Sequence, residues 1–198
     1  MPPFSLSTGH LWVGRLRFEP LGKYPNHQTD LKRVQDPLIK FAIGYSENQD
    51  LSSHSRALLR RRLERIGTSD VNQATAFFGL MWNGFNFLTE YHQRTISPQD
   101  VAFVDEDSTG YYIQAGYLLP GDQWEIAGRY EDFTIDDVQT DDEAGLADGD
   151  RTAFGIGLNR FLSGHRHKIQ ADVFAIETRL GEETLDQLRV RLQWQVKF

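Results

Sequence analysis

Apolar and polar side chains alternate along most of this chain, and the pattern is clearest in its last twelve residues. Between Leu188 and Phe198 every second residue is apolar, and the residues between them are Arg, Gln or Lys. A period of two places successive side chains on opposite faces of a β-strand. We therefore predict a strand over residues 187–198, with apolar side chains on one face and cations on the other.

The same alternation predicts eight further strands. They cover residues 10–18, 37–46, 74–82, 85–94, 111–119, 124–131, 154–159 and 168–173. Near residues 174–177 the alternation blurs, which predicts a bulge or an early end of the eighth strand. The chain is therefore expected to be all-β, with about nine strands in a single domain over residues 1–198.

Short and long connections are expected to alternate. Tight turns follow the third, fifth and seventh strands, the first at Asn83-Gly84, a dipeptide that favours a type I′ turn. Longer segments follow the second, fourth, sixth and eighth strands, at residues 47–72, 95–108, 136–150 and 180–186. The polar connection up to Asp36 is an exception, because it is long where a short turn is expected. This sorting, with a strand that ends in Phe198, is typical of an antiparallel up-and-down transmembrane β-barrel of the bacterial outer membrane.

Two of the long connections have a biased composition. Residues 56–65 contain five Arg and no Gly or Pro, so we predict a short helix within an outer loop. A solvated helix is the favoured interpretation, and a funnel for anions or a basic patch on lipopolysaccharide are the alternatives. Residues 136–150 are acidic but lack the spacing of a calcium-binding loop, so a flexible acidic outer loop is expected.

Charge and composition narrow the function. The net charge of −7 argues against a nucleic-acid partner, and the absence of cysteine excludes disulfides and thiolate metal sites. His165 and His167 have no further ligand at metal-binding spacing, so no metal site is predicted. No catalytic or phosphate-loop motif is present, so neither an enzyme nor a cofactor is expected.

The strand count predicts an incomplete barrel. Single-chain bacterial barrels have an even number of strands, whereas nine are predicted here. Residues 1–5 do not begin a signal peptide, because no basic segment is followed there by an apolar one. We therefore expect the C-terminal part of a larger outer-membrane barrel.

Several motifs resemble, in order, the C-terminal half of the phosphate-selective porin O and P family. They lie at residues 11–16 with 19–22, 110–119 with 124–130, and 157–161 with 164–165 and 168–172. The resemblance implies a sixteen-stranded, trimeric outer-membrane porin that passes phosphate or other small anions. This chain would supply a little over half of it, and the Arg-rich residues 56–65 have no counterpart that we can match.

Six cations on the polar faces of predicted strands are candidates for an anion-binding lumen. They are Arg15, Arg17, Arg129, Arg189, Arg191 and Lys197. Guanidinium groups bind phosphate bidentately, and a row of them would pass anions between successive weak sites. The alternative is that each pairs with a lumen carboxylate such as Glu125, Glu131 or Asp172.

Aromatic side chains on the apolar faces suggest contact with lipid. Those near strand ends are Trp12, Trp82, Trp124, Tyr111, Tyr117 and Trp194. An interfacial girdle explains them more simply than a track on which substrates stack. The expected partners are therefore small anions, outer-membrane lipid with lipopolysaccharide, and two further copies in a trimer. A structural or adhesive outer-membrane barrel without a pore, and a soluble ligand-binding barrel, remain as alternatives.

Overall fold

A computed structural model describes residues 9–51, 67–136, 149–180 and 183–197. These residues form one sheet of nine antiparallel strands, in which each strand pairs with its neighbours in the sequence. The strands are β1 (Leu11–Phe18), β2 (Leu38–Leu51), β3 (Ser69–Trp82), β4 (Phe85–Pro98), β5 (Glu106–Leu118), β6 (Trp124–Asp136), β7 (Gly149–Ser163), β8 (His167–Leu180) and β9 (Glu183–Val196). The predicted all-β, up-and-down arrangement of nine strands is confirmed.

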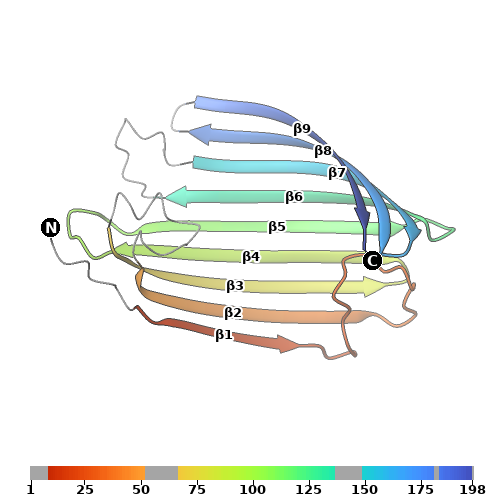
Figure 1. Ribbon diagram of the computed structural model, residues 1–198, viewed down its shortest axis with the longest axis horizontal. Coiled ribbons are helices and arrows are strands. Elements are labelled where there is room, and N and C mark those ends of the chain that lie inside the picture. Colours follow the sequence, from red (N-terminus) through yellow and green to blue (C-terminus); the bar gives the residue numbers. More distant parts are fainter. Residues whose placement is uncertain (1–8, 52–66, 137–148, 181–182, 198) are drawn as a thin grey trace.

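The sheet is curved and open (Figure 1). β1 and β9 lie at its two edges, and within the described residues they do not pair with each other. The turns after β3, β5 and β7 lie together at one end, the short-turn end, as does the end of β9 (Figure 1). The turn at Asn83-Gly84 has positive φ at both residues, as a type I′ turn requires.

The strands run farther from the short-turn end than the alternation predicts. The prediction of a loop over residues 180–186 is wrong, because β8 continues to Leu180 and β9 begins at Glu183. The loop expected at 95–108 is likewise shortened to residues 99–105. Backbone pairing continues where the otherwise apolar face of the strands becomes polar, as where Glu177 faces Asp186, so no apolar period on that face marks these segments.

The predicted bulge or break at residues 174–177 is also wrong, since β8 pairs continuously with β7 there. The alternation blurs because Phe174 and Ile176 lie on the polar face of the sheet, where they form a buried cluster with Ala153. The register shift between these two strands lies instead at Phe161 and Ser163.

Two predictions fall outside the described residues, namely the helix at 56–65 and most of the acidic loop at 136–150. Among the residues that are described, no helix is both long and apolar enough to cross a membrane.

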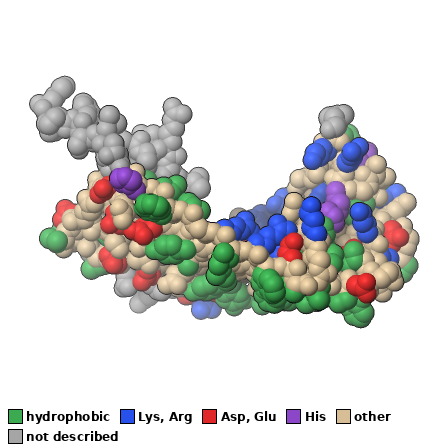
Figure 2. All heavy atoms as spheres, turned by 90° about the horizontal axis from the view of Figure 1, so that it is seen from below, with side chains coloured by type: hydrophobic (Ala, Val, Ile, Leu, Met, Phe, Trp, Pro, Cys, Tyr) green, Lys and Arg blue, Asp and Glu red, His purple; other side chains and the backbone are tan. Residues whose placement is uncertain are grey.

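The two faces of the sheet differ in chemistry. Figure 2 shows hydrophobic side chains along the convex underside, and a hollow on the concave side where Lys and Arg side chains gather. The connection between β1 and β2, residues 19–37, folds over the concave face at the short-turn end, and we call it the strap. Tyr24 of the strap packs with Met81 of β3 and Leu88 of β4 in a small buried core.

Candidate anion-binding site

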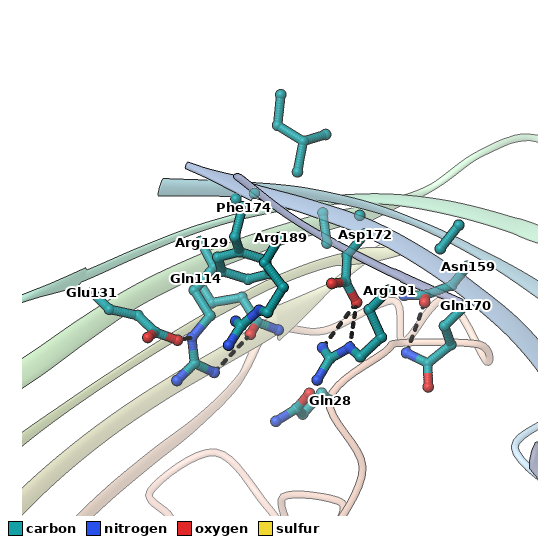
Figure 3. Close-up of a pocket in the computed structure, with 16 residues that line it drawn as sticks. Gln28, Gln114, Arg129, Glu131, Asn159, Gln170, Asp172, Phe174, Arg189 and Arg191 are labelled. Atoms are coloured by element: carbon teal, nitrogen blue, oxygen red, sulfur yellow. Dashed lines mark hydrogen bonds and ion pairs between the residues drawn. The ribbon is translucent and has the colours of Figure 1, made fainter. Parts of the chain in front are cut away.

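A polar hollow of about 330 Å³ lies on the concave face, between strands β5–β9 and the strap. Figure 3 shows the side chains of Arg129, Arg189 and Arg191 extending from the strands toward Gln28 of the strap. Three of the six predicted cations therefore gather at one site.

Strand register explains why these side chains meet. Arg129 faces Gly155 on the next strand, Gly155 faces Phe174, and Phe174 faces Arg189. A Cβ at Gly155 would overlap the ring of Phe174, so the glycine makes room for that ring on the floor of the hollow. The Arg189 guanidinium lies 4.9 Å from the centre of the ring, within range of a cation–π interaction.

Two of the three arginines have acidic partners. Arg129 Nε lies 2.6 Å from Glu131, and its guanidinium lies 3.9 Å from the centre of the Tyr112 ring. Arg191 forms an ion pair of 2.8 Å with Asp172. The pairing that we considered as an alternative therefore holds for both residues.

Arg189 differs from these two arginines. Among the described residues it forms no ion pair with a carboxylate, and its guanidinium group lies over the apolar ring of Phe174. A positive charge held in place on a ring keeps its N–H donors available for an anion. Arg189 is thus the cation in the hollow that is best placed to bind a ligand.

The other three candidates lie away from the hollow. Arg17 forms an ion pair with Glu19, and Arg15 lies one step farther along β1 on the same face. Lys197 follows the last residue of β9 at the short-turn end, where its backbone N–H donates to Arg166 at 2.7 Å. The sequence placed these residues on the correct strands or strand end but could not show which of them meet.

The sequence reasoning overlooked Lys40 on the concave side of β2. Its ammonium group lies 4.7 Å from the centre of the Phe77 ring and 5.6 Å from that of Tyr24. The alternation of β2 carried this signal, because Lys40 occupies a polar-face position. Gln28 carried no such signal, because it reaches the hollow from a connection.

Among the described residues, Glu125 forms no ion pair with an arginine, in contrast to one of the pairings that we considered. It is 3% exposed and accepts hydrogen bonds from Thr29 Oγ1 at 2.8 Å, Asn86 Nδ2 at 2.8 Å and Asn159 Nδ2 at 2.7 Å. The carboxyl group is therefore held by three neutral donors, one of which belongs to the strap.

The convex face carries two aromatic belts. The belt nearer the short-turn end contains Trp82, Phe85, Tyr117, Trp124 and Trp194, and the other contains Trp12, Tyr45, Tyr91, Tyr111, Tyr130 and Phe154. On β5 and β6 the belts lie about 20 Å apart along the strand, at the usual rise per residue. Most of these rings are exposed, Trp194 by 70% and Phe154 by 55%.

The far belt crosses the strands obliquely. Tyr91 pairs with Tyr111, whereas Trp12 lies farther from the short-turn end and the pair Tyr130–Phe154 lies nearer to it. The belt shifts by about one residue toward the short-turn end at each successive strand. With a rise of ~3.3 Å per residue and a spacing of ~4.8 Å between strands, the belt makes an angle of about 35° with the perpendicular to the strands. The belt can therefore lie in the plane of a membrane surface if the strands tilt by about 35° from the membrane normal. Membrane barrels have strand tilts of about 35–45°.

Comparison with known proteins places the chain beside a longer relative. No family model matches the chain. Over 197 residues it is 26% identical to a protein of Aquifex aeolicus (strain VF5) that is described as uncharacterized. The match covers 97% of this chain and 44% of that protein, so the chain spans less than half of the relative's length.

Proposed function

We propose that this chain forms part of an outer-membrane porin that passes phosphate or other small anions by passive diffusion. The observation that carries the proposal is the pair of aromatic belts that border the exposed apolar convex face. Aromatic girdles at both edges of an apolar outer band are typical of strands that cross a lipid bilayer. The convex face then contacts lipid, and the concave face lines a water-filled lumen.

Strand direction bears on how the proposed barrel closes. β1 and β9 run in the same direction, because nine strands alternate between them. Direct closure would create a parallel pair in an otherwise antiparallel sheet, so antiparallel closure needs an odd number of additional strands. A larger barrel fits this requirement. The similar Aquifex protein is more than twice as long as the matched segment, so its length would allow such strands.

The preference for anions rests on Arg189 and its neighbours. Arg129 and Arg191 are balanced by Glu131 and Asp172, so they contribute little net charge to the hollow. Arg189 adds a positive charge without a carboxylate partner among the described residues. A weak anion site of this kind would concentrate anions and release them again, as permeation requires.

Membrane insertion and conductance test the proposal. Together with the additional strands that close the proposed barrel, the chain should require detergent and migrate differently on a gel before and after heating, and it should form channels in planar bilayers. Reversal potentials in phosphate and chloride gradients should show a preference for anions. A chain that is soluble and monomeric without detergent would exclude the membrane location.

Substitution of Arg189 tests the anion preference. Arg189→Gln should lower the anion-to-cation permeability ratio severalfold, because it removes the unbalanced charge. The matched control is the double variant Arg191→Gln/Asp172→Asn, which removes one positive and one negative charge and so leaves the net charge unchanged. An equal loss of selectivity in both variants would refute the role of Arg189.

A structural barrel without a pore is the second candidate, and the strap favours it. The strap lies across the concave face and buries Met81 and Leu88, which reduces the space left for a channel. Chains that insert into bilayers but never conduct would support this candidate. The trimer and the contact with lipopolysaccharide stay predictions.

A further inference from the structure

The strap crosses the sheet instead of joining two neighbouring strands by the shortest path. It leaves β1 and enters β2, yet the ring of His27 stacks on that of His165 in the turn between β7 and β8, with centroids 4.2 Å apart. Gln28 lies at the hollow beneath β5–β9. The strap therefore extends from one side of the curved sheet to strands near its opposite edge (Figure 1).

Buried polar contacts fix the middle of the strap. Thr29 and Asp30 are 6% and 1% exposed. The Thr29 hydroxyl donates to Glu125 at 2.8 Å. The Asp30 carboxylate accepts the backbone N–H groups of Gly84 and Val34, each at 2.9 Å. Breaking such contacts leaves buried donors and acceptors unpaired, which makes detachment of this segment costly.

The rest of the strap is tied to two further turns. Arg33 Nε donates to Asp122 at 2.6 Å, and Arg33 Nη2 donates to the Leu118 carbonyl at 2.7 Å. The Asn83 N–H donates to the Val34 carbonyl at 2.9 Å. Contacts at both ends and in the middle argue for a fixed wall and against a loop that swings.

Tyr24 anchors the first part of the strap. Its ring lies over Gly79 of β3, where a Cβ would come within 2.9 Å of the ring carbon that bears the hydroxyl. Burial, with Asp30 nearby, raises the pKa of Tyr24 to about 12. A side chain seated in a space that only glycine leaves open fixes the position of the strap on the sheet.

We propose that the strap is a fixed wall inside the lumen, and that it sets the largest size of solute that can pass. The inference rests on the proposed porin function, and it assigns the size limit and the charge preference of the pore to different residues. The strap, through Gln28, bounds the opening on one side, and β9, which carries Arg189 and Arg191, bounds it on the other. The width of the opening then depends on the anchors of the strap, whereas the charge preference depends on the arginines.

The test releases the strap without altering the arginines. The double variant Thr29→Ala/Asp30→Ala removes the central anchors, and Asn26→Ala is the matched control, because Asn26 is an exposed strap residue. Amide hydrogen exchange of the strap is measured in the reconstituted barrel, which contains this chain and the strands that close it, together with conductance and permeability to anions of increasing size. Exchange should accelerate about fivefold for each hydrogen bond lost.

In the released variant we expect a larger conductance and passage of anions that the parent chain excludes, at nearly unchanged preference for anions. Channels that appear only in the released variant would also support the wall. Faster exchange with the same conductance and the same size limit would overturn the inference and leave the porin proposal intact. Absence of channels in both chains would overturn the porin proposal, and this inference with it.

Discussion

The convex and concave faces of this sheet are built from the same strands but gain their order in different ways. On the convex face, Leu192 and Val190 of β9 are 76% and 70% exposed, and no other part of the described chain covers them. On the concave face at the short-turn end, Met81 is fully buried and Glu125 is 3% exposed, because the strap lies over them. The convex face thus requires an external apolar partner, which the proposed function supplies as lipid, whereas the concave face has an internal one.

Polarity alone does not identify a lumen surface on this sheet. The concave face contains apolar side chains where the strap packs and charged side chains where the hollow is open. A polar position on a strand can therefore hold a ligand-binding group or an anchor for the strap. Arg189, for which we propose anion binding, and Glu125, which holds Thr29 of the strap, are examples of the two cases.

A charge on the convex face should have the largest effect. Val190→Arg places a cation in the proposed lipid-facing band, which should cost about 2–4 kcal/mol of unfolding free energy. Gln193→Arg is the matched control on the concave side of the same strand and should change stability by less than about 0.5 kcal/mol. Urea unfolding of the reconstituted chain measures both. Equal costs for the two variants would mean that the convex face does not contact lipid.

Removal of the Glu125 carboxylate should destabilise the concave face somewhat less. Glu125→Ala leaves the donors of Thr29, Asn86 and Asn159 without their acceptor, at a cost of about 2–3 kcal/mol. Glu131→Ala on the same strand breaks a more exposed ion pair with Arg129 and should cost about 1 kcal/mol or less. If Glu131→Ala proves as costly in urea unfolding, then the strap contributes little to the stability of this face.

The sequence predicted the convex face well, because its physical requirement is local. Each strand must present apolar side chains at every second position, and Trp124, Ile126 and Tyr130 show that requirement directly. Most of the predicted strands fell short beyond the far belt, where the convex face becomes polar and pairing continues without an apolar signal, and β7 also continues to Ser163 at the short-turn end.

The concave site was only partly predictable, because it depends on contacts between distant segments. Alternation placed Arg129, Arg189 and Arg191 on the polar face, but strand register brings them together. Thr29 reaches Glu125 across 96 positions of sequence, and no period within the strap announces that contact. The blurred alternation at Phe174 was a signal of the site that we interpreted as a break in the strand.

The smallest expected effect concerns pH and the far end of the strap. Burial, the nearby charge of His27 and that of Lys168 lower the pKa of His165 to about 4 from an ordinary value of 6.5. The unfolded chain therefore binds a proton at His165 at pH values where the folded chain does not. The contribution of this group to stability is fully present above pH 6.5 and is lost progressively as the pH falls toward 4.

Because His165 remains partly solvated, the change should be modest, and it is best measured as a difference between two chains. His165→Gln keeps a polar side chain that cannot titrate, so its unfolding free energy should decline less between pH 6.5 and 4 than that of the parent chain. If the unfolding free energies of the two chains decline equally with pH, then His165 is not buried by the strap as its stacking with His27 implies. The dependence of concave-face stability on the strap would then rest on its other anchors, among them Thr29, Asp30 and Arg33.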